Sequence, residues 1–429
     1  MILFSVIIPV HNTEKYLLRC IKSVLDQKHN KTEIILVEDC SKDNSLKICN
    51  SFKNNKSVKI IRHKKNLGVS ITRNHGIRAA QGKYILFLDS DDWLYPGSLM
   101  DIEMVVTQNP KTDVVIGRYN SNGFPFDNEI LFKNSNSISY TSNKFFSYIN
   151  RINFRPMIIW HYIVKKSLIK EKKIYFINVQ NGEDEEYGVR LLCSMKSLSL
   201  SSKNYYWHKH RKKGHLRYSR DIKSTDSYLK VLVEYYKYIN KTYLSSDKLK
   251  FINECIRFAY GEVSSRIILH NKKELKYLNI KLRKYLKQTK LSLHKIKRKN
   301  IYDLFENKNI FQNKDLIEKK ILKKIKSIRF NHNKIYIYCA AIHGVATLNI
   351  LQKYKYKVTA LIDDNMDIEK QTFVNVKVIT GKSFLSIKKQ YRSKSIILVC
   401  QQTIETFYAI QKKLKLNGIK NNQIIHINY

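Results

Sequence analysis

Short apolar runs alternate with amphipathic segments along the first third of the chain. The runs are rich in β-branched residues and predict strands at residues 4–9, 34–37, 58–61 and 84–88. Between them, residues 13–27, 46–52 and 69–80 repeat apolar side chains at helical spacing. Strands that are apolar throughout, separated by helices, are typical of a parallel sheet covered on both faces. This part of the chain is therefore predicted to be an α/β fold.

The predicted secondary structure changes twice in the rest of the chain. Residues 203–329 are predicted to be mostly helical, with leucine, isoleucine and tyrosine among the lysines, and hold 35 basic against 11 acidic residues. Beyond residue 333, short apolar strands and helices alternate again. We expect three parts: an α/β domain at 1–220, a basic and mostly helical region at 221–332, and a small α/β domain at 333–429.

The last part resembles small Rossmann-like domains, which usually carry a glycine-rich turn after their first strand. Only Gly344 remains of such a turn, because Cys339, Ala340 and Ala341 carry Cβ atoms where a pyrophosphate would need close backbone approach. Asp363 ends the second strand, at the place of a ribose-binding acid. With the phosphate cradle degraded, we expect a domain for packing, oligomerisation or acceptor docking rather than dinucleotide binding.

Composition narrows the class of protein. With 43% apolar and 11% aromatic residues among 429, the chain is not wholly disordered, and 5 Pro and 13 Gly exclude a collagen-like one. No apolar run reaches the roughly 18–20 residues of a membrane helix, and residues 1–10 make a poor signal peptide. Seven scattered cysteines without metal spacing fit a reducing cytosol.

The charge of +44 raises nucleic-acid binding as a rival class. The chain carries no zinc-finger spacing, no aromatic motif of an RNA-recognition domain and no recognisable recognition helix. Because charge alone supplies only non-specific affinity, we expect no nucleic-acid partner.

Acidic and polar residues gather where the predicted strands end. The first strand runs into residues 9–12, the second into 38–41, and the fourth into Asp89, Ser90, Asp91 and Asp92. Ligands of open α/β sheets bind beyond the carboxyl ends of strands. Carboxylates gathered there repel one another, and a divalent cation is the usual compensation, with oxygen ligands favouring Mg²⁺ or Mn²⁺. The alternative is a turn and helix cap, where aspartate and serine are also common.

Four sequence blocks carry a resemblance to a known family. Residues 5–20, 34–45, 66–76 and 82–96 include Ser-Val-Ile-Ile-Pro-Val-His-Asn, Val-Glu-Asp-Cys-Ser, Thr-Arg-Asn-His-Gly and Leu-Asp-Ser-Asp-Asp-Trp. In order and spacing over about 100 residues they match the family-2 glycosyltransferases of the GT-A fold.

The resemblance implies a role for each matched residue. Pro9, Val10, His11 and Glu14 would line the nucleotide pocket, Asp39 would accept a hydrogen bond from uracil, and Arg73 would lie near the nucleotide or its phosphates. Asp89, Ser90, Asp91 and Asp92 would bind the nucleotide sugar, with Asp91 and Asp89 holding Mn²⁺ or Mg²⁺. His11 and Cys40 depart from the family's usual tyrosine and glycine, so the turn at Cys40 is expected to differ in detail.

An inverting transfer needs a carboxylate that takes the proton of the acceptor hydroxyl. Residues 181–187 resemble the family's acidic motif at the start of a helix, which makes Asp184 the base and Glu183 its orienting partner. The alternative is an acidic first turn favoured by the helix dipole alone, and we assign Glu185 and Glu186 to that solvated role.

Flanking segments suggest acceptor contacts. Residues 159–162 and 165–168 resemble the family's strand before the base, and residues 205–211 the strand after it. Trp160 would stack on a sugar or pack in the core. Arg211 would meet a diphosphate or an anionic acceptor, or lie on a solvated basic edge.

The basic middle region suggests a second partner. Leu275, Leu278, Leu282 and Leu286 fall on one face of a lysine-rich helix. A basic helix with such a face is typical of binding to an anionic membrane surface, and the alternative is a helical bundle that buries the leucines.

Together these features predict a metal-dependent inverting glycosyltransferase. It would move a sugar from a nucleotide-diphosphate donor, a UDP-sugar, to a glycan or lipid-linked acceptor in bacterial surface-polysaccharide synthesis. We expect the protein in the cytoplasm, attached peripherally to the cytoplasmic face of the inner membrane. A homo-oligomer is compatible with these features. The alternative is a non-catalytic protein that binds nucleotide sugars or polyanions.

Overall fold

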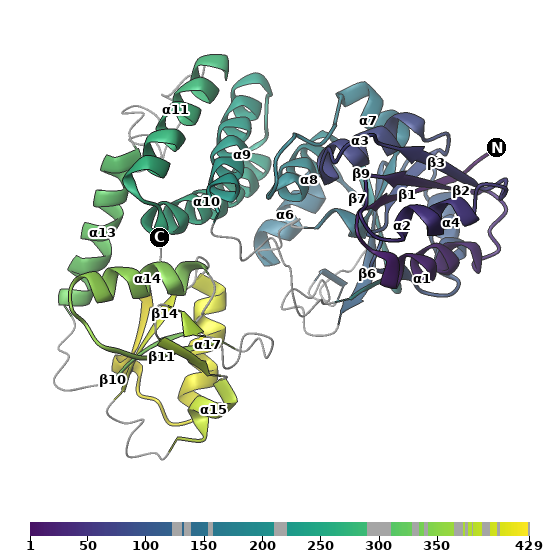
Figure 1. Cartoon of the computed structure of the whole chain (residues 1–429). Coiled ribbons are helices and arrows are strands. Elements are labelled where there is room, and N and C mark those ends of the chain that lie inside the picture. Colours follow the sequence, from purple (N-terminus) through teal and green to yellow (C-terminus); the bar gives the residue numbers. More distant parts are fainter. Residues whose placement is uncertain are drawn as a thin grey trace. The chain divides into compact units, whose positions relative to one another are not determined.

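The computed structural model describes most of the chain, as two compact units (Figure 1). It describes residues 1–121, 131–132, 139–152, 158–209, 221–289, 310–327, 334–338, 342–363, 372–373, 376–379, 381–387, 395–400 and 404–427. The first unit comprises Met1–Arg211 and Lys241–Cys255, and the second comprises Lys212–Asn240 and Ile256–Tyr429. Each unit is described by itself, and the predicted division at residues 220 and 332 remains a prediction.

Four parallel strands form one half of the N-terminal sheet, in the order β3-β2-β1-β4. They are β1 (Phe4–Val10), β2 (Thr32–Glu38), β3 (Val58–Arg62) and β4 (Tyr84–Phe87). The helices between them are α1 (Glu14–Leu25), α2 (Ser45–Ser51) and α3 (Val69–Ala79). The elements predicted for this third of the chain are thus confirmed.

A close approach fixes the position of α3 over the sheet. A Cβ atom on Gly76 would clash with the side chain of Ile7 in β1, so only glycine allows the helix to lie this near the strand. Arg73, one turn earlier on α3, is thereby held over the carboxyl ends of β1 and β4.

The other half of the sheet is mixed, which the sequence did not predict. β8 (Tyr162–Lys165) pairs antiparallel with β4 and with β6 (Val114–Ser121). β6 in turn runs parallel to β9 (Ser197–His208), to which β5 (Trp93–Leu94) and β7 (Ser139–Thr141) add antiparallel. A parallel sheet is therefore correct for the first four strands only.

The segment before the predicted base also differs from expectation. Ile159–His161 form one 3₁₀ turn (η1), the strand begins at Tyr162, and Lys166–Lys172 form helix α7. The helix after it, α8 (Glu183–Ser194), begins with four acids, as predicted. α4 (Ser98–Gln108) and α6 (Ser142–Ile152) are further helices of this unit.

The second unit combines helices with a smaller sheet. The helices are α9 (Ile222–Lys241), α10 (Ser246–Leu269), α11 (Lys272–Thr289) and α13 (Ile310–Lys326), with the unit boundary inside α10. The sheet has the order β12-β13-β11-β10-β14-β15, parallel except for β12. Its strands are β10 (Lys334–Tyr338), β11 (Val358–Ile362), β12 (Thr372–Phe373), β13 (Val376–Ile379), β14 (Ser395–Cys400) and β15 (Ile424–Ile427). Its helices are α14 (Ile342–Lys353), α15 (Gly381–Leu385) and α17 (Ile404–Leu416). An α/β alternation was predicted here.

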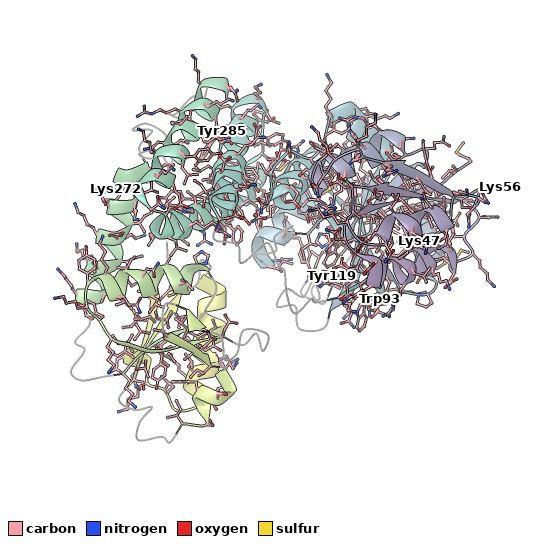
Figure 2. All side chains as sticks on the ribbon, in the orientation of Figure 1. Lys47, Lys56, Trp93, Tyr119, Lys272 and Tyr285 are labelled. Carbon is pink, nitrogen blue, oxygen red and sulfur yellow. The ribbon has the colours of Figure 1, made fainter. Side chains whose placement is uncertain are left out.

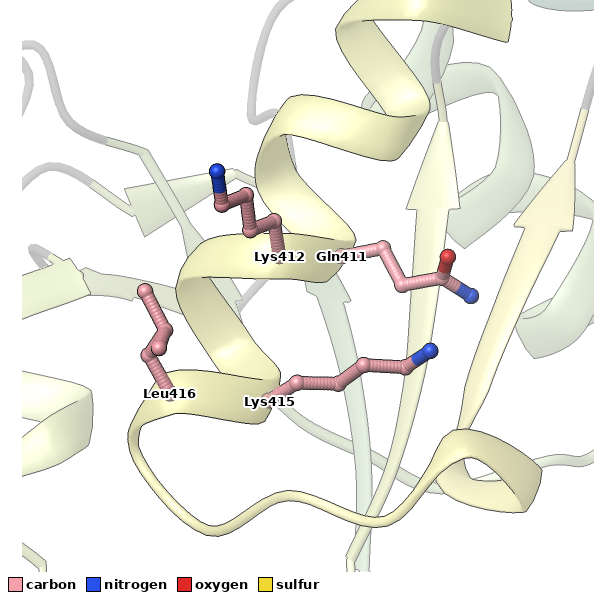
Figure 3. Close-up of a pocket in the computed structure, with 4 residues that line it drawn as sticks. All are labelled: Gln411, Lys412, Lys415 and Leu416. Atoms are coloured by element: carbon pink, nitrogen blue, oxygen red, sulfur yellow. The ribbon is translucent and has the colours of Figure 1, made fainter.

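A hollow on this sheet domain is lined by Gln411, Lys412, Lys415 and Leu416 of α17 (Figure 3). Side chains from one helix provide two cations and an amide, without the convergence of several elements that a cofactor site requires. The turn at Cys339, Ala340 and Ala341, where a phosphate cradle would lie, falls outside the described residues.

The leucine face of α11 is buried, which corrects the expectation that it meets a membrane. Leu275, Leu278, Leu282 and Leu286 are 0–8% exposed, and Tyr285 on the same helix donates a hydrogen bond to Asp226 of α9 at 2.7 Å. The bundle alternative is therefore right. Within the described residues, no helix has the length and apolar character needed to cross a bilayer.

A pair of substitutions on α11 tests this burial. Leu282→Ala removes a fully buried side chain and should lower the free energy of unfolding by about 2–5 kcal/mol. Ile280→Ala, on the same helix but 61% exposed, should change it by no more than about 0.5 kcal/mol. Denaturant unfolding followed by circular dichroism measures both. Equal effects of the two substitutions would contradict the buried leucine face.

Candidate active site

Three strand ends meet at one edge of the N-terminal sheet. Because β1, β2 and β4 are parallel neighbours, the residues that follow them lie side by side. The backbone N–H of Asp39 donates to the carbonyl of Val10 at 2.8 Å, and that of Leu88 to the carbonyl of Ile7 at 3.0 Å. Acidic residues far apart in the sequence are thereby brought to one place.

Arg73 joins this edge to the start of α8. One of its terminal nitrogens donates to Asp184 at 2.6 Å and to Glu183 at 3.3 Å, and the other donates to Asp89 at 3.0 Å. Its side chain is 4% exposed, so the contacts are shielded from water. The resemblance implies that Arg73 lies near the nucleotide or its phosphates, which stays a prediction. In the structure it binds the two acids of the predicted base motif and one acid of the predicted metal pair.

One buried cation faces three carboxylates, so the charges do not balance. Burial raises the pKa of Asp184, and the positive charge of Arg73 offsets part of that rise. Burial and the charge of Asp184 raise the pKa of Glu183 still more. Although burial alone would lower the pKa of Arg73, the charges of Asp184, Asp89 and Glu183 raise it, so Arg73 stays charged. Asp184 is thus an unusually basic aspartate held by a permanent cation.

The acidic turn after β4 is fastened to β9 by a tyrosine that sequence reasoning missed. Asp92 is buried, and its carboxylate accepts hydrogen bonds from the Tyr206 hydroxyl at 2.6 Å and the Lys209 backbone N–H at 2.7 Å. The Tyr206 oxygen also accepts from the backbone N–H of Asp89 at 3.2 Å. No sequence signal identifies this contact, because Tyr206 lies more than one hundred residues beyond the turn.

The same turn offers oxygen ligands to a cation. Asp89 keeps 30% of its side chain exposed, and Asp91 is half-buried. Burial raises the pKa of Asp92, and the negative charges of Asp91 and Asp89 raise it further. The turn therefore carries more negative charge than the groups around it offset. The described residues contain no cluster of three or more metal-binding side chains, so Asp89 and Asp91 can supply only part of a coordination shell.

Asp39 is engaged inside the protein. Its two oxygens accept hydrogen bonds from the His63 ring at 2.7 Å and from the backbone N–H groups of Leu67 and Gly68 at 2.8 and 2.9 Å. Burial would raise its pKa, but these three bonds and the His63 charge hold it below the ordinary value. His63 also contacts His75 of α3 at 2.7 Å. Asp39 thus holds the loop that precedes α3, and its contact with a nucleobase stays a prediction.

The other residues predicted for the nucleotide pocket lie near this edge. Pro9 and Val10 are buried in β1, and the His11 ring contacts the Asp39 carbonyl at 2.9 Å. The Glu14 carboxylate accepts from the backbone N–H and the side-chain amide of Asn44, the residue before α2, both at 2.8 Å.

The turn at Cys40 keeps a glycine-like backbone. Cys40 has φ +57°, in the left-handed region that favours glycine. The cysteine therefore adopts a backbone conformation that glycine favours, at a cost of about 1–2 kcal/mol. The expected difference in detail from the family's turn stays a prediction.

The two residues predicted to meet the acceptor have different outcomes. Trp160 is 4% exposed and stacks on Tyr206, with 4.4 Å between ring centroids, and on His208 at 5.4 Å. Its packing thus favours the core alternative, and it supports the tyrosine that holds the acidic turn. Arg211 lies outside the described residues.

Glu186 is not solvated as we expected. It is 1% exposed, and its carboxylate binds Arg190 one turn later at 2.5 and 2.6 Å. Arg190 also donates to the carbonyl of Tyr175 at 2.6 Å. This pair anchors α8 to the segment before it and so helps to hold Glu183 and Asp184 in place.

Comparisons with known proteins show which family the sequence resembles. The sequence model described as "Glycosyl transferase family 2" matches residues 5–172. The chain is 28% identical over 228 residues to Glycosyltransferase GlyG of Streptococcus pneumoniae, covering 51% of this chain and 75% of GlyG. It is 26% identical over 221 residues to the poly(ribitol-phosphate) beta-N-acetylglucosaminyltransferase TarS of Staphylococcus aureus, covering 50% of this chain but only 37% of TarS.

A solved structure shares the fold. The crystal structure of S. aureus TarS 1–349 with UDP-GlcNAc superimposes with a TM-score of 0.57 at 21% identity, over 73% of this chain and 89% of that one. At that identity the likeness establishes the fold alone.

The Tyr206 contact can be tested against its neighbour. Tyr206→Phe removes a donor to a buried carboxylate and an acceptor for a backbone N–H, and should lower the free energy of unfolding by about 1.5–3 kcal/mol. Tyr205 is the matched control, because its buried hydroxyl has no hydrogen-bond partner in the described structure. Tyr205→Phe should be neutral or slightly stabilising in the same denaturant titration. A Tyr206→Phe protein as stable as wild type would show that the turn is held by other contacts.

Proposed function

We propose that this chain is an inverting glycosyltransferase that uses a nucleoside-diphosphate sugar. Residues 5–172 match the glycosyltransferase family 2 model, and the fold is similar to that of TarS, which supports the proposal. The donor is a UDP-sugar, and the acceptor is a hydroxyl of a glycan or lipid-linked glycan in bacterial surface-polysaccharide synthesis. The relatives named as poly(ribitol-phosphate) transferases, and the TarS structures with UDP-GlcNAc and with UDP, support this choice.

One observation carries the proposal. Arg73 brings Asp184 of α8 and Asp89 of the acidic turn onto a single guanidinium, although 95 residues separate the two acids. Only the Arg73 side chain therefore separates Asp184, which can accept a proton, from Asp89, which can bind a cation. Transfer of a sugar needs both functions close together, because the acceptor attacks the same carbon from which the diphosphate departs.

Asp184 has the properties of the general base. As the acceptor oxygen bonds to the anomeric carbon, its proton passes to Asp184, and the bond from that carbon to the diphosphate breaks with its electron pair on the leaving group. A raised pKa makes Asp184 a better proton acceptor than an ordinary aspartate. Arg73 keeps the carboxylate oriented and ionised before the acceptor arrives. Glu183 shares the same cation and orients it.

The leaving group would be handled at the acidic turn. A divalent cation, Mn²⁺ or Mg²⁺, held by Asp91 and Asp89 would supply positive charge to the departing diphosphate. Asp92 faces Tyr206 and the backbone of Lys209, so it positions the turn rather than the cation. The nucleoside would lie over the ends of β1 and β2, beside His11 and the loop that Asp39 holds.

The first test is calorimetric titration with nucleoside diphosphates, with Mn²⁺ and with EDTA. We expect UDP to bind in the presence of Mn²⁺, and EDTA or Asp91→Ala to weaken it at least about tenfold by removing a cation contact of the phosphates. Asp184→Asn should keep UDP affinity within about twofold and abolish transfer, because only proton acceptance is lost. Near-normal turnover in Asp184→Asn would show that another group is the base. If no nucleotide bound, a non-catalytic protein that binds polyanions would replace the proposal.

The pH dependence of transfer gives a second test. Below its pKa, Asp184 is protonated and cannot act, so kcat/KM should fall on the acid side through a pKa above the ordinary aspartate value of about 3.9. Arg73 favours the ionised form, so Arg73→Gln should move this fall to higher pH, and Arg73→Lys should move it less. The control is Arg78→Gln, an exposed arginine on the same helix. An unchanged acid limb in Arg73→Gln would contradict the coupling of Arg73 to the base.

A further inference from the structure

The outward face of α11 is a row of positive charge. Because the leucines point into the unit, the basic residues point out, and six of them are exposed (Figure 2 marks Lys272 at the start of the helix). They are Lys272, Lys273, Lys276, Arg283, Lys284 and Lys287. The helix contains a single acid, Glu274, whose carboxylate already accepts the backbone N–H of Asn271 at 2.9 Å.

α13 repeats the pattern and is tied to α11. Its isoleucines 317, 321 and 325 are buried, and its exposed side includes Lys319, Lys320, Lys323, Lys324 and Lys326. The Asn279 side chain of α11 accepts the backbone N–H of Ile310, the first residue of α13, at 2.6 Å. We call these eleven exposed cations of the two helices the basic surface.

The basic surface is not neutralised from within the protein. None of its eleven cations forms an ion pair with any residue that the structure describes. Glu318 of α13 is 5% exposed and pairs with Lys353 of α14 instead. Partial burial and the charge of Lys320 lower the pKa of Lys324, a sign of crowding among like charges.

The lysine-rich composition of the whole chain does not explain the concentration of positive charge on the basic surface. Residues 1–120 hold 18 basic and 12 acidic residues, a net charge of +6, whereas residues 203–329 carry +24. Protein surfaces ordinarily mix both signs, because a large field of one sign repels itself. Asp315 of α13 is the one exposed acid that the structure describes on these two helices, against eleven exposed cations. A surface with so large an excess of positive charge is therefore expected to meet an anionic partner.

We propose that the basic surface binds a linear anionic polymer, a glycan with phosphate or carboxylate groups along its length. The inference rests on the proposed function, under which this polymer is the acceptor. Eighteen residues of α11 extend about 27 Å, so the cations lie along a line and do not converge on a pocket for one small anion.

Other anionic partners fit the surface less well. An amphipathic helix inserts into a membrane surface through a continuous apolar face, but the leucines of α11 are buried inside the unit. Its exposed large apolar side chains among the described residues are Tyr277 and Ile280 alone. Single-stranded nucleic acid is usually held by several aromatic side chains that stack on bases, and the exposed part of α11 offers only Tyr277 among the described residues. The surface supplies affinity and no chemistry, so it should act on KM for a long acceptor and leave kcat unchanged.

The test uses the full chain and long-chain inorganic polyphosphate as the probe, with tripolyphosphate for comparison. A fivefold variant replaces Lys272, Lys273, Lys276, Lys284 and Lys287 with glutamine. The matched control replaces five exposed lysines of the first unit, Lys22, Lys47, Lys53, Lys56 and Lys59, in the same way. Binding of labelled polyphosphate is measured from about 50 to 200 mM salt, the range over which counterion release changes affinity strongly. Thermal unfolding checks that each variant is folded.

We expect the α11 variant to bind polyphosphate about tenfold more weakly at the higher salt, with a smaller dependence of log K on log salt. The control should change by less than about twofold, and tripolyphosphate should bind weakly to all three proteins. Equal losses in both variants, or no loss in the α11 variant, would overturn the proposal.

Two further probes separate the remaining partners. If the α11 variant lost binding to vesicles of equal phosphatidylglycerol and phosphatidylcholine but kept polyphosphate affinity, the partner would be a membrane. If an oligodeoxynucleotide of equal charge bound more tightly than polyphosphate, it would be a nucleic acid. Either result would overturn the proposal. UDP binding is recorded for all three proteins, so failure of the proposed transferase function is seen separately from failure of polymer binding.

Discussion

The buried guanidinium of Arg73 is the interaction on which the N-terminal unit depends. A charge removed from water needs partners, and Arg73 finds three carboxylates from two distant segments. It thereby fixes the distance between α8 and the acidic turn. Burial raises the pKa of Asp184, the charge of Asp89 adds to that rise, and the charge of Arg73 offsets part of it, so the contact that holds the site also tempers its chemistry. Replacing Arg73 would leave the three carboxylates without the cation that they share.

The two halves of the sheet contribute differently to this arrangement. The parallel half supplies strand ends that face a ligand, and the close packing of α3 on β1 at Gly76 puts Arg73 over them. The antiparallel half supplies the support, because Tyr206 of β9 holds Asp92, and Trp160 stacks on Tyr206. Both halves of the mixed sheet therefore contribute to the site. The parallel strands place the acidic residues at their ends, and β9 of the other half holds the acidic turn after β4 in place.

Local sequence patterns were sufficient for many elements. The strands and helices of residues 4–88 follow from apolar periodicity, and a helix opening at Glu183 follows from four acids at its start. The residues assigned to the site came from sequence blocks that resemble a family, and their roles stay predictions. The family match and the TarS structure agree with the expected family and fold. Where the predictions failed, the error lay in the surroundings of a residue, as for Glu186, which is buried with Arg190 rather than solvated.

The sequence by itself determined the fold class, the acids at the strand ends and the basic character of the helical region, since these depend on residues close together in the chain. Only the tertiary structure decided which partners those residues have. Arg73 meets carboxylates, Asp39 meets His63, and the leucines of α11 face inward with their lysines outward. Each of these depends on contacts between segments tens to more than one hundred residues apart. Periodicity cannot specify such contacts, because one amphipathic pattern is compatible with a protein core and with a membrane surface.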